Sequence, residues 1–585
     1  MRNLINRRRI TRQNLKRFLA ECAWIGKYSL HYKWQVALYT LLGIVGTAMS
    51  LAGSISSKYI IDAVTGYDNS ILLTAVIFYV LMQLLRIGIN ALTGRISAKV
   101  NIQVHQQIRR DIFDRMMETD WESVSCYHSA DLLNRLTGDV STVSASVLGW
   151  IPDLVTRLLQ FAGTLGVIMY YDPTLALLAL ISAPVTMVVG QFAMKRMRQH
   201  NQAMRQLSSE LMVFNEESLQ NLQTVKAFDL KEHRKEMLRK LQEKHKTATL
   251  DYNIYSVGNT SLMSLVGTVV TLACTGWGVY RLWTDHITFG TMTLYLQLAA
   301  SLAGSFNVLV RMVPSAINAA TAASRVMAVT ELPVEDLSGE TEARNLKQEQ
   351  GAEGMRLSLK DVSFGYGDGP DVLKNVNIQA EPGQIVALVG PSGGGKTTLL
   401  RLLLGIVQPR GGELQISGCN GQVLKLSAST RCLFSYVPQS NTMFSGTVAE
   451  NLRMVKPQAT DEELHRVLKI ACADKFLAKK PLGLDTPILE KGGGFSQGQI
   501  QRLSIARALL ADAPVLLMDE ATSALDIEAE RQVLKNIMEA GLRRTCIVAT
   551  HRPSVLSLCQ RAYRVEDGAV TPVSLEELTQ LMQTL

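Results

Sequence analysis

The sequence predicts two parts of different fold class, an all-α membrane domain of six helices followed by a cytoplasmic α/β domain. Three observations support this division. Six long apolar blocks lie in the first 315 residues, and each reaches about 20 residues, alone or with its polar interruptions, the length of a membrane-spanning helix. From Met355 onward, short apolar strands alternate with helical patterns. A glycine-rich turn, Gly390–Thr398, lies between two apolar runs of this second part.

Residues 1–33 are polar and basic and directly precede the first apolar block. We interpret them as a topology signal and a short elbow helix on the membrane surface, because a span follows at once. A nucleic-acid-binding arm is the disfavoured alternative, although the net charge is +9. The block that starts near Trp34 is too long for a signal peptide, so we expect no cleaved signal. The 8 scattered cysteines lack metal-site spacing, which indicates reduced thiols.

The six apolar blocks predict a transmembrane domain over residues 34–330. They cover residues 35–57, 71–92, 147–171, 174–194, 252–280 and 287–310. A buried helix of a soluble protein is the alternative for any one block, but six blocks of this length make it a poor explanation of the whole pattern. We therefore expect a multi-pass protein of the cell membrane, in contact with lipid.

The connections between the blocks alternate in length and charge. Residues 62–70, 172–173 and 284–289 are short and contain no Lys or Arg, whereas residues 95–146 and 195–251 are long and rich in both. The positive-inside rule places both long connections, and both termini, in the cytoplasm. Apolar residues recur every three to five positions in the long connections, which predicts that the spanning helices continue well beyond the bilayer.

Residues 331–354 are charged, contain Pro333 and Gly339 and show no apolar periodicity, so we predict a linker there. The α/β domain is then expected over residues 355–585. Its predicted strands include residues 356–364, 385–389 and 515–518, since the first alternates apolar and polar residues and the other two are short apolar runs.

The turn GPSGGGKTT fits the phosphate-binding pattern G-x-x-x-x-G-K-[ST]. Glycines allow backbone N–H groups to approach phosphate oxygens, and the following helix N-terminus adds positive potential. Lys396 is expected to reach the β- and γ-phosphates of ATP, and the Thr397 hydroxyl to bind Mg²⁺. The predicted ATP-binding loop comprises Gly390, Pro391, Ser392, Gly393, Gly394, Gly395, Lys396, Thr397 and Thr398. A chance glycine-rich turn is the alternative, and the flanking strand and helix disfavour it.

Two carboxylates follow a second apolar strand, at Asp519 and Glu520. Ligands of α/β sheets bind at the carboxyl ends of strands. Asp519 is therefore expected to hold Mg²⁺, and Glu520 to orient or deprotonate the attacking water. Alone, this pattern often marks only a strand that meets solvent, but next to a phosphate-binding loop it indicates a P-loop ATPase domain.

The segment FSQGQ at residues 495–499 resembles the LSGGQ signature of the ATP-binding cassette (ABC) family, with Phe495 in place of Leu and Gln497 in place of Gly. In that family the signature caps ATP held by the partner subunit. The resemblance assigns this role to Ser496, Gln497, Gly498 and Gln499. Residues 523–526, SALD, resemble the D-loop of the same family, and add Asp526 to the contacts made across the dimer.

Other positions resemble family elements in the same order along the chain. Tyr366 resembles the aromatic residue that stacks on adenine, Gln439 the Q-loop glutamine that touches Mg²⁺, and His551 the switch histidine on the γ-phosphate. Taken singly, they could be a surface aromatic, a turn residue and a strand-end histidine. Their order around the glycine loop and the Asp519–Glu520 pair favours the family interpretation.

The membrane half also resembles ABC exporters. Residues 130–140 resemble the first intracellular coupling segment, residues 223–228 the second, and residues 324–326 the end of the sixth helix. Six spans followed by one cassette resemble an exporter-type half-transporter. This implies a homodimer or heterodimer with two ATP sites, and a small-molecule, lipid or peptide substrate. An importer with the exporter fold, or an ATP-gated channel or regulatory membrane protein, remains the alternative.

Two arginines interrupt the apolar blocks. Arg86 and Arg157 are expected about 21–23 Å below the outer surface, where a charge costs at least about 2.5–3.5 kcal/mol unless it meets a partner or a wet cavity. One hypothesis is that they line the cargo path and favour an anionic group, with Gln83, Asn90 and Gln297 adding hydrogen bonds. The other is that Asp153, one turn before Arg157, forms an ion pair that fixes helix packing.

Overall fold

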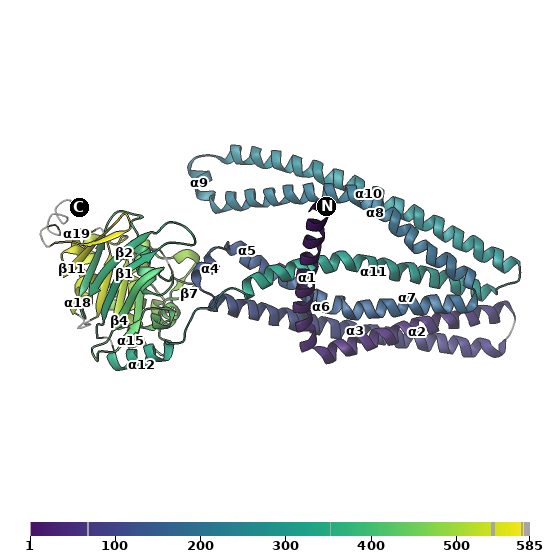
Figure 1. Ribbon diagram of the computed structural model, residues 1–585, viewed down its shortest axis with the longest axis horizontal. Helices are drawn as coiled ribbons and strands as arrows, with labels where there is room; N and C mark the ends of the chain where they lie inside the picture. Colours follow the sequence, from purple (N-terminus) through teal and green to yellow (C-terminus); the bar gives the residue numbers. More distant parts are fainter. Residues whose placement is uncertain are drawn as a thin grey trace. The chain divides into compact units, whose positions relative to one another are not determined.

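The chain forms two compact units, which we describe separately. A computed structural model describes residues 2–66, 69–351, 353–440, 442–539, 544–550, 552–574 and 577. The first unit contains Met1–Phe113 and Leu132–Val329, and the second contains Asp114–Asp131 and Thr330–Leu585. The first unit is helical, and the second holds every strand that the structure describes (Figure 1).

The elements of the first unit are α1 (Arg2–His31), α2 (Lys33–Thr65), α3 (Asn69–Glu118), α5 (Ser129–Asn134), a π-helical turn (Arg135–Asp139), α6 (Val140–Gly149), α7 (Ile151–Tyr171), α8 (Pro173–Gln220), α9 (Leu222–Ala227), α10 (Lys231–Trp283) and α11 (Phe289–Thr330). Five of the six apolar blocks lie largely in one long helix each, whereas the third, 147–171, begins in α6 and continues in α7 after a break at Trp150. Among the described residues, 4 helices are long and apolar enough to cross a membrane: Lys33–Thr65, Ile71–Glu118, Ser129–Tyr171 and Lys231–Trp283.

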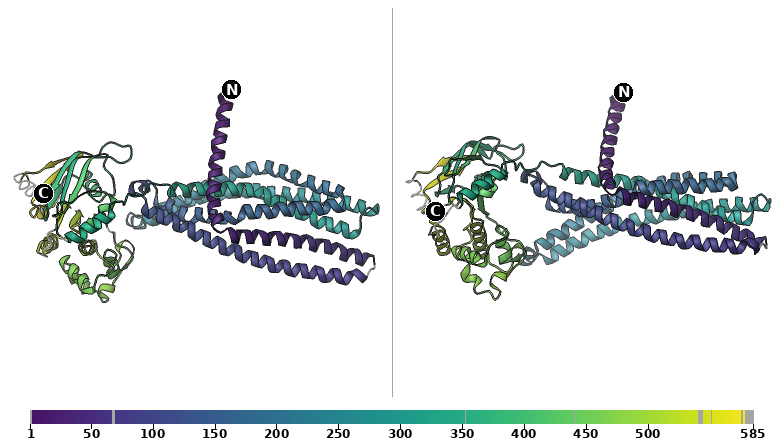
Figure 2. Two further views of the ribbon diagram at one scale, coloured as in Figure 1. Left: turned by 60° about the horizontal axis from the view of Figure 1, so that its bottom comes forward. Right: turned by 90° about the horizontal axis from the view of Figure 1, so that it is seen from below.

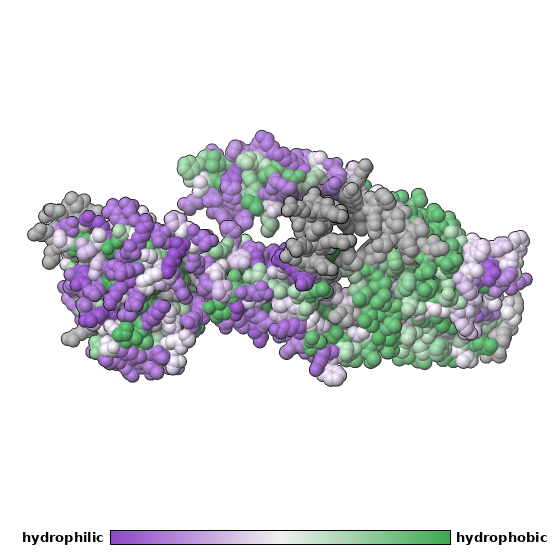
Figure 3. All heavy atoms as spheres, in the orientation of Figure 1, coloured by the Kyte–Doolittle hydropathy of each residue, from purple (hydrophilic) through white to green (hydrophobic). Residues whose placement is uncertain are grey.

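Hydrophobic residues form a belt over the spanning helices, with hydrophilic residues on either side of it (Figure 3). The helices continue beyond this belt, as the periodicity of the long connections predicts. Helix α3 has 50 residues, α8 has 48 and α10 has 53, so each extends over roughly 70–80 Å. A hydrocarbon core is only about 30 Å thick.

Two helix pairs are visible in this unit. Helices α2 and α3 run side by side in all views, and the Ser56 hydroxyl donates to the Ala75 carbonyl at 2.9 Å (Figure 2). Helices α8 and α10 form a second pair that reaches a short turn at α9 (Figure 1). Asp229, which follows α9, has a φ of 51°, a left-handed conformation that ends the helix before α10 begins.

The end of α3 belongs to the second unit and pairs with the predicted linker. Backbone bonds run from Asp120 N to Pro333 O (3.2 Å) and from Glu335 N to Glu118 O (2.9 Å). The short helix α4 (Trp121–Ser125) follows, and the Asp120 carboxylate caps it by accepting from Ser123 N at 2.8 Å.

The segment 331–354, predicted as a linker without periodicity, contains the helix α12 (Glu340–Gln350). Ala343 and Leu346 of this helix are fully buried in the core of the second unit. The apolar face of this helix consists of only these two residues, three positions apart. A pattern this short does not show the repeated apolar spacing that predicts a helix from sequence. Glu335 also pairs with Arg431 through both carboxylate oxygens, at 2.9 and 3.1 Å.

The second unit holds two main sheets and their covering helices. Its strands are β1 (Arg356–Phe364), β2 (Leu373–Ala380), β3 (Ile385–Val389), β4 (Gly411–Ser417), β5 (Val423–Lys425), β6 (Phe434–Val437), β7 (Gly446–Thr447), β8 (Pro487–Ile488), β9 (Val515–Asp519), β10 (Thr545–Ala549), β11 (Arg561–Glu566) and β12 (Ala569–Pro572). Its other α-helices are α13 (Lys396–Leu403), α14 (Val448–Arg453), α15 (Asp461–Ile470), α16 (Asp474–Leu477), α17 (Gln497–Leu510), α18 (Ile527–Glu539) and α19 (Pro553–Leu556). The three strands predicted from the sequence correspond to β1, β3 and β9.

The sheet that positions the site has the order β12-β11-β3-β10-β9-β6. All neighbouring pairs in it are parallel except β11 with β12. The second sheet, β2-β1-β4-β5, is antiparallel. The buried side chains of β3, β9 and β10 form near-continuous apolar runs, as expected for a parallel sheet covered on both faces.

Candidate functional site

Most residues expected at the nucleotide site lie at one edge of the parallel sheet. The glycine loop follows β3, the Asp519–Glu520 pair ends and follows β9, and Gln439 lies just after β6. Strand β10 separates β3 from β9. His551, predicted as the switch histidine, comes just after β10 and lies outside the described residues. Because parallel strands present their carboxyl ends to the same edge, the topology explains why these distant segments meet.

The glycine loop is closed against the backbone of β11. Gly390, Gly393 and Gly395 have φ values of 150°, 84° and 110°, which favour glycine. A Cβ at Gly390 would lie 2.1 Å from the Val565 carbonyl oxygen, whereas a Cβ at Gly393 would meet no atom within 4 Å. The loop is thus packed on one side and open on the other, which fits a cradle for phosphate oxygens.

Lys396 holds the loop from inside. Its Nζ donates to the carbonyl oxygens of Gly390 (2.7 Å) and Pro391 (3.0 Å), and the residue is 6% exposed. The neighbouring residues Ser392 and Gly393 are exposed at the tip of the loop. The ammonium group therefore lies within the ring of loop atoms that is expected to surround phosphate.

Asp519 is the buried acid of the site, at 2% exposure. Burial raises the pKa of its carboxyl, while hydrogen bonds from Thr397 and Tyr436 oppose that rise. Tyr436 Oη donates to Asp519 Oδ2 at 3.4 Å, and burial together with Asp519 raises the pKa of Tyr436 to about 12. The Thr397 hydroxyl and the Asp519 carboxylate, which lie within hydrogen-bonding distance, are hard oxygen donors of the kind that Mg²⁺ prefers.

Glu520 is oriented by its backbone and by the segment after β6. Its φ is 47°, a conformation that costs on the order of 1–3 kcal/mol for a non-glycine residue and is often found at active sites. Its N–H donates to the Ala549 carbonyl at 3.0 Å. Gln439 Nε2 donates to Glu520 Oε2 at 2.7 Å. The structure thus brings together the two residues that the sequence assigned to water activation and metal contact.

Tyr366 is linked to the glycine loop and to α4. Its hydroxyl lies 3.1 Å from Thr398 Oγ1 and accepts from Arg401 Nη1 at 3.1 Å. The Arg401 guanidinium stacks on the Trp121 ring at 4.9 Å from the ring centre. Glu122 Oε1 accepts from the Gly367 N–H at 2.9 Å.

Sequence reasoning missed Trp121 and Arg401, because both act through contacts between segments that are far apart in the chain. A bulky aromatic beside the break after α3 was the available signal for Trp121.

The signature segment forms the start of α17. Ser496 is its N-cap: Ser496 Oγ accepts from Gln499 N (3.3 Å), and Gln499 Oε1 accepts from Ser496 N (3.0 Å). This reciprocal capping box fixes the helix N-terminus. Gly498 is required sterically, since a Cβ there would lie 2.8 Å from the Ala524 carbonyl oxygen.

The two departures from the family signature have local explanations. Gln497, the first residue of α17, is exposed and has no left-handed backbone, so no glycine is needed at this position. Phe495 packs edge-on against Phe476 with ring centres 6.2 Å apart, and Lys480 Nζ lies 4.9 Å from the Phe495 ring centre. The aromatic ring at position 495 is thus held by two neighbouring side chains of the same unit.

The D-loop is held from two sides. Gln501 Nε2 donates to Ser523 Oγ (3.1 Å), and Gln501 Oε1 accepts from Ala524 N (2.9 Å). Arg552 donates to the carbonyl oxygens of Ser523 (2.5 Å) and Leu525 (2.9 Å). In this structure the Asp526 carboxylate accepts from Ala529 N at 2.7 Å and caps α18.

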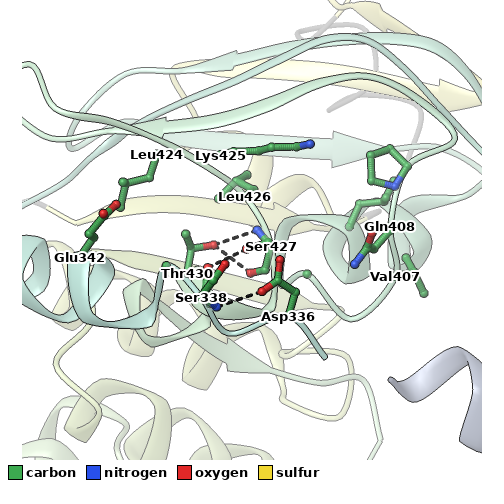
Figure 4. A pocket seen from close by; sticks show the side chains of 15 residues that line it. Asp336, Ser338, Glu342, Val407, Gln408, Leu424, Lys425, Leu426, Ser427 and Thr430 are labelled. Atoms are coloured by element: carbon green, nitrogen blue, oxygen red, sulfur yellow. Dashed lines mark hydrogen bonds between the residues drawn. The ribbon is translucent and has the colours of Figure 1, made fainter. Parts of the chain in front are cut away.

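A cavity of about 370 Å³ lies in the same unit, and none of the glycine-loop residues lines it (Figure 4). Its lining is part apolar and part polar, and several of the polar residues bond to one another. Asp336 Oδ1 accepts from Ser338 N (3.0 Å), Ser427 N donates to Thr430 Oγ1 (3.1 Å), and the hydroxyls of Ser427 and Ser429 are 2.7 Å apart. These mutual bonds give no indication of a ligand site.

The helical unit brings Arg86 and Arg157 to one cavity, together with Asn90 and Asp153. The Arg157–Asp153 ion pair, one of the two hypotheses for these arginines, is not formed: among the ion pairs between described residues, none includes either of them. Asp153 instead accepts from Tyr39 Oη at 3.1 Å, and Arg157 donates to Gln160 at 2.9 Å.

Neither Gln83 nor Gln297 is among the residues that line this cavity. Gln297 is exposed on α11.

Comparisons with known proteins agree with this architecture. A family model described as "ABC transporter transmembrane region" matches residues 36–306, and one described as "ABC transporter" matches residues 373–523. The ATP-dependent lipid A-core flippase of Desulfotalea psychrophila is 30% identical over 79% of this chain and 80% of its own length. A multidrug resistance ABC transporter ATP-binding and permease protein of Lactococcus lactis is 27% identical over 91% of this chain and 88% of its own.

The fold also resembles that of a bacterial Atm1-family ABC exporter solved with ATP bound, with a TM-score of 0.78 at 20% identity, covering 94% of this chain and 96% of the other. At this identity the likeness shows the fold alone. The matches to both family models and to the flippase show that the chain belongs to the ABC transporters, as a multi-pass membrane protein with a fused domain that binds and hydrolyses ATP.

Proposed function

We propose that this chain is one half of an ABC exporter that couples ATP binding and hydrolysis to alternating access and to the outward movement of an amphipathic lipid, peptide or drug-like molecule. The observation that carries the proposal is the meeting of the glycine loop, Asp519, Glu520 and Gln439 at one sheet edge. Helices α8 and α10 extend beyond the apolar belt, which fits a role in passing conformational changes to the spanning segments. The relatives named for lipid and multidrug transport support this substrate range.

In the proposed site, the loop N–H groups and Lys396 bind the ATP phosphates. Thr397, Asp519 and the amide oxygen of Gln439 would hold Mg²⁺, which when bound neutralises charge on the β- and γ-phosphates. The Gln439 nitrogen donates to Glu520, so the amide oxygen is the atom left for a metal. Glu520 orients a water molecule and accepts its proton, and Tyr366 stacks on the adenine.

The proposal includes a dimer, in which residues 496–499 and Asp526 of one chain complete the ATP site of the other. Ser496 and Gln497 are exposed in the single chain, at a helix N-terminus suited to phosphate. The turn around α9 also exposes apolar side chains: Leu219 at 71%, Leu222 at 46% and Phe228 at 73%. Such a surface fits a partner chain. Since this chain carries every predicted ATP-site residue, a homodimer is sufficient.

The domain division at residues 34–330 and 355–585, both termini in the cytoplasm and a place in the cell membrane complete the proposal. The basic long connections support this orientation. An importer that uses the same fold, and a channel gated by ATP, are the competing functions.

The test uses inside-out vesicles that contain the chain or its Glu520→Gln variant. An exporter moves a fluorescent amphipathic substrate into these vesicles only with ATP, and the variant loses hydrolysis by 10²-fold or more while it still binds ATP, the scale of a lost general base. Glu528→Gln, an exposed acid on α18, is the matched control. Uptake in right-side-out vesicles would show an importer, and ion conductance without vanadate-sensitive ATPase would show a channel.

A further inference from the structure

The helical unit contains a polar cavity of about 300 Å³ between α2, α3 and α7. Tyr39, Ser50, Arg86, Asn90, Asp153 and Arg157 contribute polar groups to its wall. These helices carry three of the apolar blocks, in which polar and charged side chains are rare. A cavity with so many polar groups in its wall is therefore unusual there. Polar groups inside spanning segments mark functional pathways more often than packing.

Neither arginine forms an ion pair with another described residue. Arg86 Nη1 donates to Ser50 Oγ at 3.3 Å, and its buried Nε has no partner there. Arg157 Nη1 donates to Gln160 Oε1 at 2.9 Å. Both guanidinium groups thus bond to neutral oxygens.

The one carboxylate in the cavity wall bonds to a neutral hydroxyl of the same wall. Asp153 accepts from the Tyr39 hydroxyl at 3.1 Å. Two cations and one anion line the cavity, which leaves an excess of positive charge.

The depth of the cavity makes this excess significant. Arg86 lies about 17 residues after the start of α3, or about 25 Å along the helix, and Arg157 about 14 residues before the end of α7, or about 21 Å. Measured from these helix ends, both positions fall in the inner half of a hydrocarbon core about 30 Å thick. A guanidinium at this depth requires an anionic partner or water.

Small residues of α2 shape the cavity. A Cβ at Gly43 would lie 2.9 Å from Thr156 Oγ1, so glycine keeps α2 close to α7 at this level. Gly46 and Thr47 line the same wall. The volume suits a compact polar group and is at the lower limit for a whole drug-sized molecule.

We propose that this cavity binds the oxyanion of the cargo, a phosphate or carboxylate, through Arg86 and Arg157. The guanidinium fork matches the geometry of both anions. The inference rests on the proposed transport function and gives it a substrate class, an acidic amphipathic molecule whose charged group enters the cavity while its apolar part stays along the helices. A free anion shares this chemistry and is a separate arm of the test.

The experiment measures binding directly, without ATP, with the full chain in nanodiscs of zwitterionic lipid. The probes are radiolabelled short-chain phosphatidic acid, the phosphatidylcholine with the same chains, and inorganic phosphate. We expect phosphatidic acid to bind at least about 10-fold more tightly than the phosphatidylcholine. Arg86→Gln and Arg157→Gln should each weaken it by about 10- to 100-fold, since a hydrogen bond to a charged group contributes on that scale.

Two further variants separate recognition from packing. Asp153→Asn removes the competing carboxylate and should tighten phosphatidic acid binding, an effect that a purely structural cluster would not produce. Arg239→Gln, at an exposed position of α10, should leave binding unchanged. If the glutamine variants fail to fold, Arg86→Lys and Arg157→Lys keep the charge and should bind with intermediate affinity.

Equal binding of both lipids, or binding unaffected by all four arginine variants and by Asp153→Asn, would overturn the proposal. Phosphate that binds as tightly as phosphatidic acid would support the oxyanion site and identify a small anion as its ligand. Binding that follows the arginines, in a protein that fails the vesicle transport test, would support the site and reject the transport function. The two failures are therefore distinguishable.

Discussion

The Asp139 carboxylate accepts two hydrogen bonds from the Arg325 guanidinium, one of them at 2.7 Å from Nε. Asp139 is 4% exposed, at the junction of the π-helical turn with α6, and Arg325 is near the end of α11. Arg135 Nη1 donates to the Arg325 carbonyl at 2.8 Å. Two segments that resembled ABC exporters separately, residues 130–140 and 324–326, are thus one connected structure in the helical unit.

Asp139→Asn should lower the stability of the helical unit by about 1–3 kcal/mol, because it leaves a charged donor with a weakened partner. The Arg325 side chain is 47% exposed, which limits the loss. The measurement is the thermal unfolding midpoint in detergent, in a double-mutant cycle with Arg325→Gln and with the exposed Asp251→Asn as control. Additive losses in the double variant would contradict the coupling.

Arg401→Gln should raise the KM for ATP by about 3- to 30-fold and change kcat little, because the stacked guanidinium holds the Tyr366 hydroxyl and stabilises ground-state and transition-state binding alike. Trp121→Phe should keep most of the effect of the wild-type ring, and Trp121→Ala should resemble Arg401→Gln. Steady-state ATPase measurements give both constants. Lys360→Gln, at an exposed position, is the control and should leave the KM unchanged. An unchanged KM in Arg401→Gln as well would exclude a role of Arg401 in ATP binding.

Ser496→Arg in one chain and Lys396→Ala in its partner should give a mixed dimer with one intact ATP site and one damaged twice. This follows if the signature acts on nucleotide held by the other chain. Two affinity tags allow purification of the mixed dimer, and nucleotide trapping counts the sites that hydrolyse ATP. Damage to both sites would show that the signature acts within its own chain.

Gly498→Ala should reduce ATPase activity at least about 10-fold, whereas Gln497→Ala should be tolerated. A Cβ at Gly498 would meet the Ala524 carbonyl at 2.8 Å and displace the D-loop, while Gln497 is exposed at the first position of α17. The two variants are neighbours and both end with alanine, but only Gly498→Ala introduces a new Cβ. The ATPase rates and unfolding temperatures of both variants test this, and a full loss in Gln497→Ala would contradict it.

Cys546 should resist alkylation across the range of pH in which the protein stays folded. Burial raises the pKa of its thiol to about 12, so at pH 8 only about one molecule in 10⁴ carries the reactive thiolate. Cys126 and Cys419 are exposed and should react first. Maleimide labelling at pH 7 and pH 9 followed by peptide mass spectrometry reports each site, and rapid labelling of Cys546 at pH 9 would contradict its burial.

Local patterns predicted the elements that local chemistry determines. Strands β1 and β3 begin and end where the alternation or the apolar run does, and the glycine loop adopts the left-handed conformations that its residues allow. The meeting of Gln439 with Glu520 follows from parallel topology once the order of strands is known. The role of each site residue stays a prediction.

What the sequence did not reveal depends on pairing across long distances. The burial of Leu346 needs the surface of the α/β domain, and the stack of Arg401 on Trp121 joins residues that no periodicity relates. The Arg157–Asp153 pair had the correct helical spacing, yet Tyr39 on another helix takes the carboxylate. Spacing along one helix cannot reveal a competitor on its neighbour.

The capping box at Ser496 restricts the direction in which the Ser496 hydroxyl can donate its proton. The Ser496 oxygen receives the Gln499 N–H through a lone pair, so the hydroxyl keeps its own proton. The helix start limits the rotation of the hydroxyl, and the proton is free to be donated outward, to an acceptor such as a phosphate oxygen. Threonine at this position would preserve that polarity, whereas aspartate would still cap the helix but would present a second acceptor to an anion and repel it.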